Sequence, residues 1–312
     1  MYHFFKIMKN IRDVLTKAKT IKKFTMAVAH AHDEDVLTAV NGAMEYGFLE
    51  PILFGDEKKI KEILTLKKYP LNKFTIINTN SAEESAKQAV RFAKEGKADV
   101  LMKGILETKT LLKEVVNRET GIREKELLSH ASILSFPNIK KLLFITDGAM
   151  VLYPNVEQKI KLIENALELM RAIGYHNLIK VGLVSAIETE NPKLVSSYEA
   201  VEVMKYFKEN PLPNVVVEGP FAVDNLISEE AARKKGIKSA VAGDVDLLVF
   251  PNLDSGNVFY KTSVYLANAD SAGLILGAKV PIVLTSRADH SVIKLYSIAL
   301  AGVYQDGKVT TN

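Results

Sequence analysis

Residues 24–54 read FTMAVAHAHDEDVLTAVNGAMEYGFLEPILF, and this stretch indicates the fold class. An apolar run, Phe24–Ala29, precedes a segment of helical period, Asp33–Tyr46, and a second apolar run, Pro51–Phe54, follows. Strands that are apolar on both faces and separated by helices are typical of a parallel sheet covered on two sides. We therefore expect a strand–helix–strand unit here, with Asp33 as the cap of the helix.

The same alternation continues along the chain, so the expected class is α/β with mostly parallel sheets. At 312 residues the chain is too long for one compact unit, and we expect two domains. The other expected strands are Phe74–Ile77, Asp99–Met102, Ala131–Phe136, Leu142–Ile145, Ile179–Val184, Val215–Val217, Asp246–Phe250 and Pro281–Leu284. The other expected helices are Asp56–Thr65, Ser81–Glu95, Thr108–Asn117, Val156–Ile173, Pro192–Lys208, Asp224–Lys235, Asn257–Ala269 and Ser291–Val303.

Composition excludes several classes of protein. Lys plus Arg number 41 against 37 Asp plus Glu, a net charge of +4 without a long basic run, which argues against nucleic acid and suits small anionic substrates. The absence of cysteine excludes disulfides, thiolate nucleophiles and Cys-ligated metals. Neither a signal peptide at Met1–Asn10 nor an apolar run of about 18 residues is found, so we expect a cytoplasmic protein without a membrane span.

Nucleotide-binding and hydrolase fingerprints are missing. The chain has no G-x-G-x-x-G, no G-x-x-x-x-G-K-[ST] and no G-x-S-x-G, which argues against a Rossmann dehydrogenase, a P-loop NTPase and an α/β-hydrolase. In open parallel sheets, ligands bind at the carboxyl ends of the strands, so the turns that follow the strands are the candidate sites.

Several such turns are rich in polar residues, namely Met102–Gly104, Thr146–Gly148, Glu218–Pro220, Pro251–Asn257 and Thr285–His290. Thr285–His290 follows a strand and precedes a helix, and its hydroxyls, backbone N–H groups and Arg287 suit an anion, although an ordinary helix cap with a surface arginine has the same pattern. Pro251–Asn257 also joins a strand to a helix, and it could bind a ligand or be an ordinary turn capped by Asn257.

The histidines give weaker signals. His30 and His32 could share one face of a strand as a metal pair, but no third ligand is indicated and we expect no metal site. His130 precedes a strand and could be either a core histidine or part of a binding cleft.

A combination of motifs resembles the phosphate acetyl/butyryltransferase family over nearly the whole chain. These motifs are VAGDVD at 241–246, FPNLDSGN at 250–257, Tyr260-Lys261, Glu218-Gly219-Pro220 and Ser286-Arg287. Three further motifs resemble the butyryltransferase branch of the family more than the acetyltransferase branch. They are Lys103-Gly104 with Thr108, Leu128-Ser129-His130 and Thr146-Asp147. Gly148 falls where the acetyl branch often carries Cys, which implies that no thiol is needed.

The resemblance implies two α/β/α domains of the isocitrate/isopropylmalate dehydrogenase type, 1–134 plus 277–312 and 135–276, with the active site in the interdomain cleft. It also implies that butanoyl-CoA and phosphate form butanoyl phosphate and coenzyme A by direct attack of one substrate on the other. The expected partners are acyl-CoA, phosphate and further copies of the chain, as a dimer or larger homo-oligomer. Coenzyme A is a substrate, and no cofactor is expected.

The resemblance also implies roles for particular residues. Ser286 and Asp289 would be catalytic, with Asp289 near the position of a proposed base. Phosphate would be bound by Arg287, Lys113 and Thr108, although Lys113 replaces an arginine and lacks its bidentate geometry. The residues expected to contact the substrate or coenzyme A are Lys103, His130, Asp254, Ser255, Asn257 and Lys261.

Three alternatives stay open at the level of sequence. An acetyl or branched-chain substrate is possible because a methylene changes binding by only ~1–3 kcal/mol. An oxidoreductase on the same fold would need a nicotinamide site and metal-binding aspartates, and neither is indicated. A non-catalytic binding protein disagrees with the intact Ser286-Arg287 pair.

Overall fold

The computed structural model describes residues 8–311, with side chains through residue 308, and the chain divides into two compact units. Unit 1 holds Ser129–Asp270 and the described residues before Ile11. Unit 2 holds Ile11–Leu128 and the described residues from Ser271 onward. The domain boundaries at residues 134 and 276 stay a prediction.

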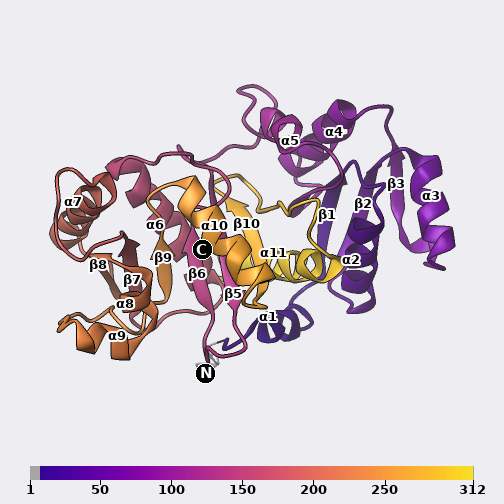
Figure 1. Cartoon of the computed structure of the whole chain (residues 1–312). Coiled ribbons are helices and arrows are strands. Elements are labelled where there is room, and N and C mark those ends of the chain that lie inside the picture. Colours follow the sequence, from indigo (N-terminus) through magenta and orange to yellow (C-terminus); the bar gives the residue numbers. More distant parts are fainter. Residues whose placement is uncertain (1–7, 312) are drawn as a thin grey trace. The chain divides into compact units, whose positions relative to one another are not determined.

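Unit 2 contains the strand–helix–strand unit from which the fold class was inferred, and β1, β2 and β3 lie side by side in it (Figure 1). Its strands run in the order β3-β2-β1-β4-β11-β10. Its strands are β1 (Phe24–Ala29), β2 (Leu49–Gly55), β3 (Thr75–Asn78), β4 (Val100–Lys103), β10 (Asp270–Leu276) and β11 (Ile282–Val283). Its helices are α1 (Ile11–Ala18), α2 (Glu34–Glu45), α3 (Glu57–Leu66), α4 (Ala82–Lys94), α5 (Thr108–Val115) and α11 (Ser291–Thr311), with a 3-10 turn at Leu71–Lys73. Helix α11 packs against α1 and α2.

Unit 1 has the strand order β5-β6-β9-β7-β8. Its strands are β5 (Ser129–Ser135), β6 (Leu143–Thr146), β7 (Ile179–Val184), β8 (Val215–Phe221) and β9 (Leu247–Val249). Its helices are α6 (Val156–Ala172), α7 (Val195–Glu209), α8 (Val223–Ile227), α9 (Glu229–Lys234) and α10 (Leu253–Tyr265).

The predicted α/β class with mostly parallel pairing is confirmed. Strands β1, β2, β3 and β4 pair in parallel in unit 2, as do β6, β9, β7 and β8 in unit 1. Two antiparallel pairs, β5 with β6 and β10 with β11, depart from the pattern. Strand β10 was not predicted, because the expected helix over 257–269 and strict strand–helix alternation left no place for it.

The helix starts in the structure show which starts the local sequence predicted correctly and which it misplaced. The carboxylate of Asp33 and the hydroxyl of Ser81 accept backbone N–H groups at the starts of α2 and α4, so both predicted helix starts are confirmed. Helix α10 starts earlier than predicted, because Asn252 caps it and Asn257 lies inside it. The single helix predicted over 224–235 is two helices, and Ser228 caps the second.

Each unit has its own apolar core. In unit 2, Met26, Phe54 and Leu101 are completely buried under the helices. In unit 1, a cluster on the strands and α8 includes Leu134, Ile145, Leu226 and Leu248, among others. Within residues 8–311, no helix is long and apolar enough to cross a bilayer.

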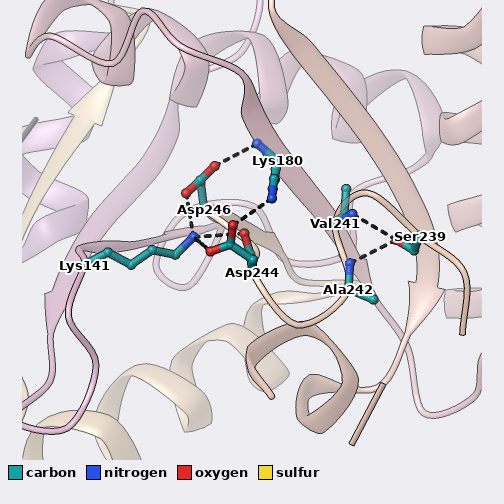
Figure 2. A network of polar contacts seen from close by, with 7 residues as sticks. All are labelled: Lys141, Lys180, Ser239, Val241, Ala242, Asp244 and Asp246. Carbon is teal, nitrogen blue, oxygen red and sulfur yellow. Dashed lines mark hydrogen bonds and ion pairs between the residues drawn. The ribbon is translucent and has the colours of Figure 1, made fainter. Parts of the chain in front are cut away.

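A charged network joins the amino ends of three neighbouring strands in unit 1 (Figure 2). Lys141, just before β6, donates to Asp244 at 2.7 Å and to Asp246 at 2.8 Å. Lys180 of β7 donates through its side chain to Asp244 at 2.7 Å and through its backbone N–H to Asp246 at 2.9 Å. Because Asp246 immediately precedes β9, this network links the three strands at the edge opposite their carboxyl ends.

Candidate active site

The carboxyl edge of the unit 2 sheet is built by a close approach of two strand ends. Ala29 of β1 lies opposite Lys103 of β4, and the N–H of Gly104 donates to the carbonyl of Ala29 at 2.8 Å. A Cβ on Gly104 would lie 2.2 Å from the carbonyl oxygen of His30, so only glycine fits there. Glycine at 104 therefore lets the end of β4 lie directly against the residue that follows β1.

The residues after β11 form a turn from Ser286 to Asp289. Asp289, 3% exposed, accepts the backbone N–H of Ser286 at 2.7 Å, and its own N–H donates to the Ser286 carbonyl at 3.2 Å. The Ser286 hydroxyl accepts the N–H of Ala288 at 3.3 Å, which leaves its own hydrogen available to a ligand. Arg287 is exposed at the tip of the turn.

Two buried lysines belong to the same region. Lys294, on α11, is 3% exposed and donates to the carbonyl of Ser286 at 3.3 Å and to that of Asp289. Lys103 is 4% exposed, and its ammonium donates to the carbonyls of Gly104 and Leu106 at 3.2 and 3.1 Å.

Burial lowers the pKa of Lys103 to about 8. The positive charges of Arg287 and Lys294 lower this pKa further, while Asp33 and Asp289 oppose the shift. The structure therefore brings together three cations and two carboxylates at one sheet edge, a balance that favours an anionic ligand.

The two histidines after β1 lie beside this edge. Their ring centroids are 4.1 Å apart, and His30 Nδ1 is 3.2 Å from the hydroxyl of Ser85. Burial, followed by the charges of His32 and Lys59, lowers the pKa of His30 to about 4. Among the residues that the structure describes, no group of three metal-ligating side chains is found, and the pair stays without a third ligand.

Unit 1 carries a second polar turn, after β6. Asp147, which is buried, accepts the backbone N–H groups of His130, Ala149 and Met150 at 2.8 Å each. Burial raises the pKa of Asp147, against the opposing charge of His130. A Cβ on Gly256 would lie 2.4 Å from the carbonyl oxygen of Asp147, so glycine at 256 allows α10 to start against this turn.

The α10 residues expected at the site divide into two kinds. Ser255 donates to the carbonyl of Asn252 at 2.9 Å, and Asn257 donates to that of Gly148 at 3.0 Å, so both hold the start of α10 and the neighbouring turn. Asp254 and Lys261 are exposed on the same helix and are accessible to a ligand. His130 is buried in β5, with Nε2 3.4 Å from Ser132.

Thr108 and Lys113 both lie on α5 of unit 2. Thr108 is the first residue of the helix and Lys113 is exposed in its last turn. Glu107 precedes the helix without making a side-chain capping bond, so the first turn keeps backbone N–H groups for solvent or a ligand. Lys113 is not among the charged groups that shift the pKa of Lys103.

Sequence reasoning missed two residues of this arrangement. Lys294 lies inside a helix expected to be ordinary, and a lysine on the apolar face of that helix was the available signal. Asp147 was named within a polar turn and a family motif but was given no role, because nothing in the sequence shows that its carboxylate is buried against three backbone N–H groups.

With this geometry described, comparison with known proteins identifies the family. The model of the phosphate acetyl/butaryl transferase family matches residues 81–302, which include the Ser286–Asp289 turn, Lys103 and α10. The chain belongs to this family. It is a phosphate acyltransferase, and the predicted resemblance is confirmed.

Individual relatives differ in the acyl group that they are named for. The "Probable phosphate butyryltransferase" of Bacillus subtilis is 41% identical over 93% of this chain and 96% of its own length. A phosphate acetyltransferase of Thermotoga maritima is 40% identical over 89% of this chain and 94% of its own length. At these identities the family and its chemistry are shown, and the acyl group is not.

Solved structures support the same family and fold. A branched-chain phosphotransacylase from Enterococcus faecalis superposes with a TM-score of 0.82 at 33% identity, over 90% of this chain and 99% of that one. A 4-hydroxythreonine-4-phosphate dehydrogenase from Salmonella typhimurium, 14% identical, matches with a TM-score of 0.57 over 91% of this chain and all of its own. The second likeness shows the fold alone and confirms the predicted dehydrogenase-like class.

Proposed function

We propose that this phosphate acyltransferase moves a butanoyl group between coenzyme A and inorganic phosphate. The observation that carries the proposal is the Ser286–Asp289 turn beside Lys103, where an exposed arginine, a half-buried hydroxyl and a surplus of positive charge occur at one sheet edge. The butanoyl assignment is supported by the pattern at Lys103-Gly104 and Leu128-Ser129-His130, and by the naming of the Bacillus subtilis relative.

Arg287 is proposed to bind phosphate. A guanidinium presents paired N–H donors to phosphate oxygens, and the exposed Arg287 is accessible to such an anion. Thr108 and Lys113 of α5 are proposed to add a hydroxyl and a positive charge for the same anion.

Ser286 is proposed to stabilise the transition state. Attack of phosphate on the thioester carbonyl, or of the thiol on an acyl phosphate, places negative charge on the carbonyl oxygen. The Ser286 hydroxyl accepts the Ala288 N–H and can donate its own hydrogen to that oxygen. Asp289, expected as a base, accepts the Ser286 N–H, and we propose that it positions the serine.

In unit 1, the exposed Asp254 and Lys261 of α10 are proposed to contact coenzyme A, because a cation and a hydrogen-bond acceptor suit its phosphates and its amide groups. Ser255, Asn257 and His130 are proposed to support these contacts, since each is held by bonds within its own unit. Bringing two substrates together in the reacting geometry would supply much of the rate.

Thiol release from a panel of acyl-CoAs, with and without phosphate, tests the function. We expect phosphate-dependent release of coenzyme A, with a higher kcat/KM for butanoyl-CoA than for acetyl-CoA. A higher value for acetyl-CoA or for a branched acyl-CoA would make the branch assignment wrong. Release that does not need phosphate, or no release from any short acyl-CoA, would contradict the function itself.

A branched-chain acyl group is the second candidate substrate, after the name of the Enterococcus faecalis structure. That protein is a branched-chain phosphotransacylase with a TM-score of 0.82 to this chain, so 2-methylpropanoyl-CoA and 3-methylbutanoyl-CoA belong in the panel. Because one methylene changes binding by only ~1–3 kcal/mol, a ranking of kcat/KM values is the informative readout.

A further inference from the structure

Lys103 is the last residue of β4, and its side chain is held in a defined place. The Nζ atom donates to the carbonyls of Gly104 at 3.2 Å and Leu106 at 3.1 Å, and only 4% of the residue is exposed. A neutral amine has two N–H donors and one lone pair. Two main-chain acceptors therefore hold both hydrogens of the neutral form and leave the lone pair to accept a proton.

The charges that act on Lys103 permit both protonation states. Arg287 and Lys294 repel the ammonium, while Asp33 and Asp289 stabilise it, and burial penalises it. The resulting pKa of about 8 is close to that of a free cysteine thiol, about 8.5. Proton transfer is most efficient when the pKa of the catalytic group is near the operating pH.

We propose that Lys103 carries the thiol proton of coenzyme A during acyl transfer. This inference rests on the proposed function and assigns its proton-transfer group. With acyl phosphate and coenzyme A, the neutral amine takes the thiol proton as the sulfur–carbon bond forms. The ammonium returns that proton to the departing phosphate oxygen as the carbon–oxygen bond breaks. The products are acyl-CoA and hydrogen phosphate, and Lys103 is regenerated.

Other titratable groups of this sheet edge are less suited to this role. The carboxylate of Asp289 accepts the N–H of Ser286, and protonation at that oxygen would disrupt the turn. With a pKa of about 4, His30 is a weak base toward a thiol. Arg287 carries a guanidinium, which presents N–H donors and no acceptor for a proton.

Replacement of Lys103 separates proton transfer from charge. Lys103→Arg keeps a positive charge that cannot be given up, and Lys103→Met removes the charge at similar length. In the direction that consumes butanoyl phosphate, we expect both variants to lower kcat about a hundredfold or more, with the KM of butanoyl phosphate changed by less than about threefold. Lys87→Met, an exposed lysine on α4, is the matched control and should keep wild-type kinetics.

The pH profile adds a readout that a structural role would not change. Wild-type kcat should rise through pH 8 and then level off, because the neutral amine is the active form. For Lys103→Arg, the plateau should disappear. A flat wild-type kcat between pH 6.5 and 9 overturns the proposal, and so does a Lys103→Arg variant with the wild-type kcat and plateau.

Chemical rescue covers the case in which the longer replacements do not fold. In Lys103→Ala, added propylamine should restore kcat in proportion to its neutral fraction, while propanol of the same length should not. Rescue by both, or by neither in a folded variant, contradicts proton transfer by Lys103. If the wild-type protein itself uses no acyl phosphate, the proposed function fails; if it is active and the variants behave as wild type, only the role of Lys103 fails.

Discussion

The carboxylate of Asp289 accepts the backbone N–H of Ser286 at 2.7 Å and thereby closes the turn that carries Arg287 at its tip. Because Asp289 is buried and Arg287 is exposed, the turn has an anchored side and a side that faces solvent. Lys294 holds the same turn from α11 through the carbonyls of Ser286 and Asp289. The turn therefore presents one exposed residue to a possible ligand, and buried residues hold it in place.

Arg287→Ala should raise the KM for phosphate and leave the KM for acyl-CoA nearly unchanged. Loss of a charge-assisted anchor should cost about 2–4 kcal/mol, or roughly a hundredfold in kcat/KM for phosphate. Arg287→Lys should recover part of the loss, because the charge returns without the paired donors. Steady-state kinetics in both substrates check this; a folded Arg287→Ala with the wild-type phosphate KM would make Lys113 the first candidate for the anchor.

Ser286→Ala should lower kcat and change neither KM by more than about twofold, because its bond is expected mainly in the transition state. One lost oxyanion donor typically costs about a hundredfold or more in kcat. Ser263→Ala, on α10 of unit 1, is the matched serine replacement, since its hydroxyl donates to the Phe259 carbonyl within its own helix. An equal rise in KM and fall in kcat/KM for Ser286→Ala would mean that the serine binds the ground state instead.

Lys294→Met should weaken catalysis, although we do not expect Lys294 itself to contact substrate. The carbonyls of Ser286 and Asp289 lose a buried donor, which costs about 1–3 kcal/mol for each group left unsatisfied. We expect a lower melting temperature, a higher phosphate KM and partial recovery of both in Lys294→Arg. Wild-type phosphate KM in a destabilised Lys294→Met would show that the lysine supports α11 and not the turn.

His30 should make the protein sensitive to mild acid. Its pKa of about 4 in the folded state lies below the ordinary value of 6.5, so the unfolded chain binds the proton more strongly. The free energy of unfolding should therefore fall as the pH drops from 6.5 toward 4, and no contribution should remain above 6.5. His30→Asn, which tolerates the positive φ of 59° at this position, should show a smaller fall in urea midpoint between pH 7 and 4.5.

The exposed His290 gives the control for this measurement. His290→Asn is the matched control for the substitution itself, because it replaces an exposed histidine by the same residue. An identical acid response of the wild type and His30→Asn would show that other groups dominate acid unfolding.

Asp246→Ala should destabilise unit 1 more than Asp244→Ala, although both remove a carboxylate from one network (Figure 2). The side chain of Asp246 is 15% exposed and accepts the backbone N–H of Lys180, whereas that of Asp244 is 61% exposed. We expect about 1–3 kcal/mol for Asp246→Ala and less than about 1 kcal/mol for Asp244→Ala, measured by urea unfolding. Equal losses would indicate that the ion pairs, and not the backbone bond, stabilise the strand ends.

Local patterns explain which elements could be predicted. The cap Asp33 and the helix start at Ser81 were predicted because a capping side chain bonds within its own first turn. Strand β10 could not be predicted in the same way, because its antiparallel pairing with β11 depends on the position of a neighbouring strand. The start of α10 was misplaced because Asn252 and Asn257 are equally suitable caps, and the approach of α10 to the turn after Asp147 is a tertiary contact.

By itself, the sequence determined the α/β class, the motifs that place the chain in its family, and the Ser286-Arg287 pair that follows a buried strand. These features depend on spacing along the chain, which residue order records directly. Only the tertiary structure showed that Lys103 and Lys294, from a strand and a helix far apart in sequence, are buried beside the Ser286–Asp289 turn. Burial and the sum of neighbouring charges set the pKa of Lys103, and both arise only when the separate segments are packed together.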